Sequence, residues 1–186
     1  LGDEYVVPSW VATDIPGSQV PLLPGEKVNF WDMMNLCIHL SGNDAAHALA
    51  DWIEGGGGPD VSVPLFVARM NDRAAQIGMT DTHFNNPNGF ENEAVGPELG
   101  EHYSTPVDMA LLSRVAMENY MFRDIVDAAT FNMIRQLPLP GQPGGKVFGG
   151  YAGLSLRLAQ LEGRAAATAE GPVQFNDQQR FRGRSL

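Results

Sequence analysis

The chain has 186 residues, 44% of them hydrophobic and 18% charged, a balance typical of a soluble globular domain that can bury one core. Its formal net charge of −10 argues against nucleic acid as a partner, because phosphate binding needs clustered Lys and Arg. The single cysteine, Cys37, excludes an internal disulfide framework and cysteine-based zinc sites. The 186 residues contain neither the features of a signal peptide nor an apolar run long enough for a membrane span.

Local signals in the first third of the chain predict a short strand and two helices. The strand is expected over residues 5–7. Asn29 is a favoured N-cap, and apolar residues at helical spacing predict a largely buried helix over residues 30–39. The polar run at 41–44 interrupts that helix and begins a second one, which four glycines at 55–58 end.

The rest of the chain is predicted to alternate helices with loops. An irregular stretch rich in Asn, Gly and Pro is of the kind that often borders a substrate. In chain order we expect a helix over 64–77 closed by Gly78, this irregular stretch over 80–100, a helix opened by 104–108 with Val107, Ala110, Leu111 and Val115 on its buried side, a short helix over 122–128, and a strand over 131–135 stopped by Pro138 and Pro140.

The balance of charge changes near Ser155. Residues 1–155 carry seven Lys or Arg and nineteen Asp or Glu, whereas residues 156–186 carry five Arg and three acids. The second stretch has few bulky apolar residues, so it has little to bury in exchange for being ordered. We therefore expect residues 1–155 to form the folded domain and residues 156–186 to be an atypical, poorly packed tail.

The tripeptide Ser41-Gly42-Asn43 lies between two predicted helices with strong apolar faces. Taken alone, it favours the simpler interpretation that Ser41 or Asn43 caps the second helix, since both residue types are preferred caps. Catalysis becomes the stronger hypothesis only when the wider sequence is considered.

Several separated segments carry a specific resemblance. They are LSGNDAA at residues 40–46, FVARMN at 66–71, IGMTDTHFNNPNG at 77–89, HYSTPVDMALL at 102–112, and the run around 130–136. In this order and spacing they closely resemble the serine D-alanyl-D-alanine carboxypeptidases, the low-molecular-mass penicillin-binding proteins. The resemblance extends over about residues 5–155 and implies the α/β transpeptidase or β-lactamase-like fold, of which this chain would be mainly the helical part with few short strands.

The family's chemistry depends on three motifs. A serine in S-x-x-K attacks the peptide carbonyl and forms an acyl-enzyme, with the lysine as its base. The S-x-N motif lines the opposite wall of the cleft, and K-T-G binds the terminal carboxylate of the substrate. The resemblance thus implies that Ser41 relays a proton toward the leaving amine and that Asn43 orients the lysine and the substrate.

The other two motifs are absent from these 186 residues. None of the eight serines has a lysine three positions later, and the two lysines, Lys27 and Lys146, are not followed by Thr-Gly. In the family the nucleophile lies farther upstream than the residues available before Ser41. We therefore expect an internal fragment, inactive as given, whose tail at 156–186 is the product of a shifted reading frame or is disordered.

Metal and cofactor chemistry has little support in the sequence. The four histidines, at positions 39, 47, 83 and 102, lack the spacing of known metal motifs, and His83 and His102 are expected to position loops. The family often has His where Asn88 stands, so no role is assigned to that position. We expect neither a metal nor an organic cofactor.

The sequence therefore predicts part of a serine carboxypeptidase that trims terminal D-Ala from peptidoglycan stem peptides. Stem peptides ending in D-Ala-D-Ala would be its substrates, β-lactams its inhibitors, and the outer face of the cytoplasmic membrane or the periplasm its location. Two alternatives stay open: a β-lactamase-like serine hydrolase, and a non-catalytic module that binds peptidoglycan or a protein partner. An S-x-x-K motif upstream would favour the enzyme.

Overall fold

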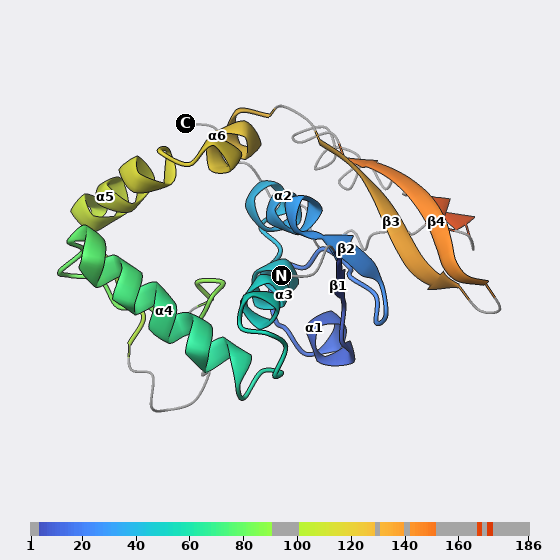
Figure 1. Ribbon diagram of the computed structural model, residues 1–186, viewed down its shortest axis with the longest axis horizontal. Helices are drawn as coiled ribbons and strands as arrows, with labels where there is room; N and C mark the ends of the chain where they lie inside the picture. The colour runs from blue at the N-terminus through green and yellow to red at the C-terminus, as the bar shows by residue number, and fades with distance from the viewer. Residues whose placement is uncertain are drawn as a thin grey trace. The chain divides into compact units, whose positions relative to one another are not determined.

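The computed structural model describes residues 4–90, 101–128, 131–139, 142–151, 167–168 and 171–172 (Figure 1). The chain divides into two compact units, Leu1–Asp127 and Ala128–Leu186. The first unit holds six helices and one pair of short strands among its described residues, and the second holds strands.

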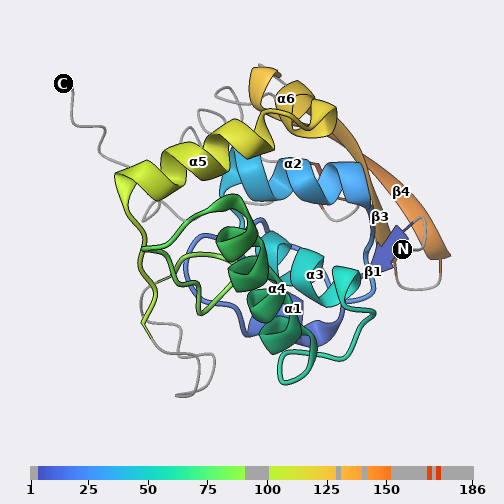
Figure 2. The same cartoon turned by 60° about the vertical axis from the view of Figure 1, so that its left-hand side comes forward.

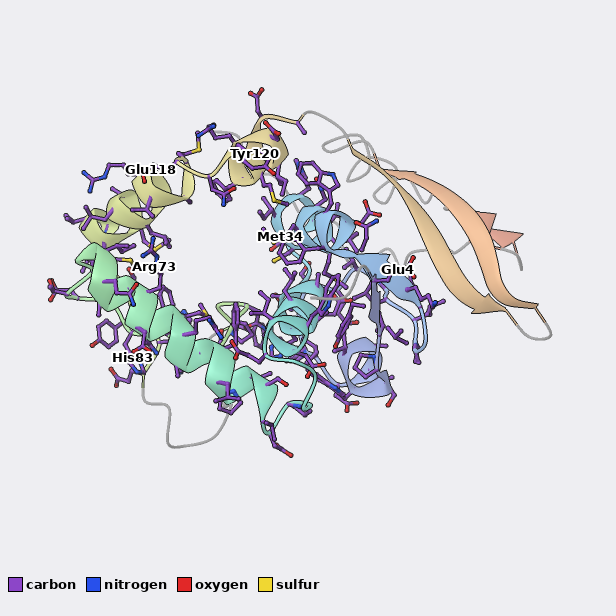
Figure 3. All side chains as sticks on the ribbon, in the orientation of Figure 1. Glu4, Met34, Arg73, His83, Glu118 and Tyr120 are labelled. Carbon is purple, nitrogen blue, oxygen red and sulfur yellow. The ribbon has the colours of Figure 1, made fainter. Side chains whose placement is uncertain are left out.

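The first unit begins with two strands of three residues each. Strand β1 (Glu4–Val6) pairs antiparallel with β2 (Lys27–Asn29), and Glu4, labelled in Figure 3, forms a 3.6 Å ion pair with Lys27 across them. The five-residue helix α1 (Ser9–Thr13) lies between the two strands in sequence. This helix is too short to show periodicity, and the sequence did not predict it.

Helices α2 (Phe30–Leu40) and α3 (Asn43–Ile53) follow as the sequence predicts. The side chain of Asn29 accepts a hydrogen bond from the backbone N–H of Asp32, which confirms Asn29 as the N-cap of α2. Helix α3 is the centre of the unit, because all but one of its eleven residues are buried. It packs against α1, α2 and α4 (Figure 2).

A buried carboxylate fastens the end of α3. Asp51 accepts hydrogen bonds from the hydroxyl of Tyr5 at 2.7 Å and from the backbone N–H of Gly58 at 2.9 Å. Tyr5 also stacks on Trp52 with 5.6 Å between ring centroids. These contacts tie β1 and the glycine loop at 55–58 to the helix.

Three further helices complete the first unit: α4 (Ser62–Ile77), α5 (Pro106–Ala116) and α6 (Tyr120–Asp127). Gly78 ends α4 with φ of 86°, as predicted, and Thr105 caps α5 by accepting from the N–H of Asp108. Glu118 and Tyr120 mark the turn between α5 and α6 (Figure 3).

The prediction of a buried apolar side on α5 is wrong. Asp108 is the only buried residue of this helix, and Val107 is 70% exposed. Helix α4 packs against α5, but this contact leaves the apolar side chains of α5 half-buried or open. Helical spacing shows which residues of α5 share a face, but it does not indicate whether another segment covers that face.

The second unit is described mainly by a hairpin of β3 (Phe131–Leu139) and β4 (Gln142–Tyr151), which pair antiparallel. Strand β3 extends past Pro138, where the sequence predicted a stop. The register shifts between Leu137 and Leu139, so Pro138 falls in an irregularity where no ladder N–H is required. Of the predicted tail, only β5 (Ala167–Thr168) and β6 (Gly171–Pro172), an antiparallel pair, lie within the described residues.

Candidate functional site

The candidate site is the turn between α2 and α3, which carries Ser41, Gly42 and Asn43. Ser41 ends α2 in the left-handed conformation, with φ of 56° and ψ of 40°. It is the only non-glycine residue with positive φ in the part of the chain that the structure describes. Its side chain is exposed, and its hydroxyl forms no hydrogen bond to a described residue. A serine therefore occupies a position that glycine would fill at lower cost.

Neither Ser41 nor Asn43 is the N-cap of α3, which corrects the simpler interpretation of the tripeptide. The N-cap of α3 is Gly42, and no side chain caps through it. The first amides of α3 are instead satisfied by other groups: the N–H of Asn43 donates to the carbonyl of Ser18 at 2.8 Å, and that of Ala45 to Oδ1 of Asp44 at 3.0 Å. The hydroxyl of Ser41 is thus left available.

Asn43 is buried and held by the loop before β2. Its Nδ2 donates to the carbonyl of Pro16 at 2.8 Å, while its Oδ1 has no hydrogen-bond partner among the described residues. Gly17 makes this approach possible: it adopts φ of +88°, and a Cβ there would lie 2.5 Å from Nδ2 of Asn43. The side-chain amide therefore has a fixed nitrogen and an open oxygen.

Gly42 and Asp44 press the turn against the same loop. A Cβ on Gly42 would lie 2.7 Å from Cγ2 of Val20, so only glycine fits at the centre of the tripeptide. The carboxylate of Asp44 is 1% exposed and accepts from the N–H of Val20 at 3.0 Å. Asp44 was not identified from the sequence, because its partner lies 24 residues away along the chain.

Burial raises the pKa of Asp44 to about 6, although the backbone N–H groups of Val20 and Ala45 favour its charged form. Burial, together with the negative charge of Asp44, also raises the pKa of the Cys37 thiol to about 11. Cys37 is therefore a neutral thiol near pH 7 and a poor nucleophile.

Replacing Ser41 with glycine should stabilise the chain. We expect Ser41→Gly to raise the free energy of unfolding by roughly 0.5–1 kcal/mol, because it relieves the left-handed strain at a small entropic cost. Ser41→Ala should change stability little, because no capping hydrogen bond is lost. Urea denaturation of both variants measures this, and a clear loss with Ser41→Ala would restore the capping interpretation.

Replacing Asp44 with asparagine should remove a pH dependence of stability. Because its pKa is raised on folding, the folded chain binds more protons than the unfolded chain between about pH 4 and pH 6. The contribution of Asp44 to the free energy of unfolding therefore falls as pH rises through this window, and the full cost of the buried charge is present above it. Asp44→Asn should gain roughly 1–3 kcal/mol over wild type at pH 7.5 and little at pH 4.

The measurement is a series of denaturation curves across this pH range. Asp60→Asn, which removes the same charge from an exposed position, is the matched control and should give a nearly constant difference. A difference between Asp44→Asn and wild type that does not vary with pH would contradict the prediction.

The described part of the irregular stretch, residues 80–90, is organised by side chains on neighbouring elements. Asn71 on α4 pairs through its amide with both backbone groups of Phe84, at 2.8 Å and 2.7 Å. His83, labelled in Figure 3, bonds the carbonyl of Glu101 at 2.6 Å, and His102 bonds Asn85, as expected for loop-positioning histidines. Residues 91–100 lie outside the described part.

The side chain of Asn88 accepts a hydrogen bond from the N–H of Phe90 and closes a turn. Among the described residues, no three His, Cys, Asp or Glu side chains gather as a metal site would require. No helix in the same part of the chain is long and apolar enough to cross a membrane.

Comparison with known proteins identifies the class. The model of the D-alanyl-D-alanine carboxypeptidase family matches residues 6–134, so the chain belongs to this family. The match covers the S-x-N turn, the loop before it and the helices around it.

Individual relatives agree with this assignment. The D-alanyl-D-alanine carboxypeptidase DacF of Bacillus subtilis is 36% identical over 103 residues, which are 55% of this chain and 23% of that protein. DacB2 of Mycobacterium tuberculosis is 35% identical over 128 residues, 66% of this chain and 40% of that protein. The chain therefore spans less than half the length of these two relatives.

Solved structures extend the likeness to the fold. A mutant of the Streptomyces K15 DD-transpeptidase superimposes with a TM-score of 0.68 at 27% identity, over 88% of this chain and 60% of that one. The transpeptidase-type fold, represented here mainly by its helical part, is thus confirmed.

Proposed function

We propose that this chain contributes the S-x-N wall of the active site of a serine D-alanyl-D-alanine carboxypeptidase. The substrates are peptidoglycan stem peptides ending in D-Ala-D-Ala, outside the cytoplasmic membrane. The attacking serine and its lysine belong to an S-x-x-K motif, and β-lactams inhibit the enzyme by acylating that serine. Both S-x-x-K and K-T-G are supplied from outside these 186 residues. By itself the chain is inactive.

In this proposal Ser41 passes a proton toward the leaving D-Ala amine. The observation that carries it is the strained conformation of Ser41 with an exposed hydroxyl, which a capping or packing role would not require. Asn43 orients the neighbouring groups. Its Nδ2 is fixed on Pro16, so Oδ1 is the atom that can accept from a lysine ammonium or a substrate N–H.

The test uses the complete enzyme, meaning the full protein that joins this chain to S-x-x-K and K-T-G. We expect stoichiometric acylation by labelled penicillin and release of D-Ala from a peptide ending in D-Ala-D-Ala. Sustained penicillin hydrolysis without D-Ala release would favour a β-lactamase-like hydrolase instead. Retention on peptidoglycan with neither reaction would favour a non-catalytic binding module. The absence of S-x-x-K and K-T-G from this sequence is the observation that favours this alternative.

A further inference from the structure

The loop between α1 and β2 meets the S-x-N turn through a set of hydrogen bonds at residues 16–20. Two of them come from Asn43: its backbone N–H reaches Ser18, and its Nδ2 reaches Pro16, both at 2.8 Å. The third runs the other way, from the N–H of Val20 to the carboxylate of Asp44. The loop and the turn therefore hold each other from both sides.

Asp44 is the anchor of this arrangement. Residues 14–26 contain neither helix nor strand, so their path depends on contacts with the rest of the unit. Oδ1 of Asp44 accepts from Val20 and from Ala45, which fixes the carboxylate to its own helix and the loop to the carboxylate. A carboxylate accepts N–H groups more strongly than a neutral acceptor, which offsets part of the cost of its burial.

We infer that Asp44 is a positioning residue for the S-x-N site: it holds residues 16–20 in place, and these in turn fix the side-chain amide of Asn43. This inference rests on the proposed function for its catalytic consequence, but its structural half stands alone. Without the acceptor at position 44, the segment from Pro16 to Val20 is no longer held against the turn. The side-chain amide of Asn43 then loses its fixed orientation. Misplacement of a group in an active site by about 1 Å can cost roughly a hundredfold in rate.

The first experiment follows amides of this chain by NMR. In Asp44→Ala, hydrogen exchange at the Val20 N–H should accelerate at least about tenfold, and the side-chain NH₂ resonances of Asn43 should shift toward those of a free amide. Asp44→Asn keeps an acceptor oxygen and should preserve both signals. In Gly17→Ala the new Cβ would meet Nδ2 of Asn43 and displace the loop directly. This variant should therefore shift the Asn43 signals although residue 44 is still aspartate.

The second experiment measures acylation of the complete enzyme by penicillin. Asp44→Ala should slow acylation or deacylation by roughly ten- to a hundredfold, and Asp44→Asn should restore the rate to within about threefold of wild type. Asp51→Ala is the matched control. Asp51 is a buried carboxylate of the same helix, but it accepts from Tyr5 and Gly58 instead of from residues 16–20. This variant should destabilise the fold but leave the rate of the folded enzyme within about threefold.

Several results would overturn the inference. Unshifted Asn43 signals in Asp44→Ala would do so even if Gly17→Ala shifts them, because Gly17→Ala acts on Asn43 directly and serves only to show that the signals respond to the loop. If Asp44→Ala does not fold, the rate of Asp44→Asn decides. An equal loss of rate in Asp51→Ala, or failure of Asp44→Asn to restore the rate, would also reject it. A wild-type enzyme that is never acylated would refute the proposed function instead, and the NMR comparison would still decide whether Asp44 positions Asn43.

Discussion

In the complete enzyme, Ser41→Ala is expected to lower turnover of a peptide ending in D-Ala-D-Ala by about 10²–10⁴, the usual range for a general acid–base group. The same change should leave the melting temperature nearly unaltered, because the hydroxyl of Ser41 caps neither adjoining helix and is exposed. The two measurements on one sample therefore separate a catalytic role from a structural one.

The control for this comparison is Ser113→Ala. Ser113 is also an exposed serine of the first unit, and its hydroxyl donates to the carbonyl of Met109 within α5. Its removal should leave turnover within about threefold of wild type, as for surface changes away from a site. A folded Ser41→Ala enzyme within the same limit would show that the left-handed serine is not a proton relay, whatever its conformation costs.

Sequence reasoning located the helices of the first unit because their ends carry local signals. Asn29, Thr105 and Gly78 act at the boundaries where their chemistry predicts. Local signals also placed Ser41 and Asn43 on one turn. They could not reveal that the turn leaves Ser41 exposed and buries Asn43, because the difference arises from contacts with residues 16–20.

Those contacts show where prediction from a single sequence ends. Asn43 meets Pro16 across 27 residues, and Asp44 meets Val20 across 24. Nothing in the residue types fixes such a pairing, since an Asp in the first turn of a helix is explained equally well by the helix dipole. The same limit applies to α5, whose apolar spacing is real but whose burial depends on neighbours that spacing does not identify.

The 186-residue chain itself should not be acylated by penicillin. Acylation needs a nucleophile with a base beside it, and no serine here has a lysine one helical turn away. Three residues after Ser41 stands Asp44, a buried carboxylate committed to the N–H groups of Val20 and Ala45. Of the two lysines, Lys27 is paired with Glu4, and Lys146 lies on β4, far along the chain from any S-x-x-K spacing. The Cys37 thiol is neutral near pH 7, because its pKa is raised to about 11.

Intact-mass spectrometry after incubation with a labelled penicillin measures this directly, with the complete enzyme as the positive control. We expect no adduct on the chain under conditions that label the complete enzyme stoichiometrically. A stoichiometric adduct would require a nucleophile other than the S-x-x-K serine, and peptide mapping would locate it. If it mapped to Ser41, that serine would be an attacking group, and its role as a proton relay would have to be abandoned.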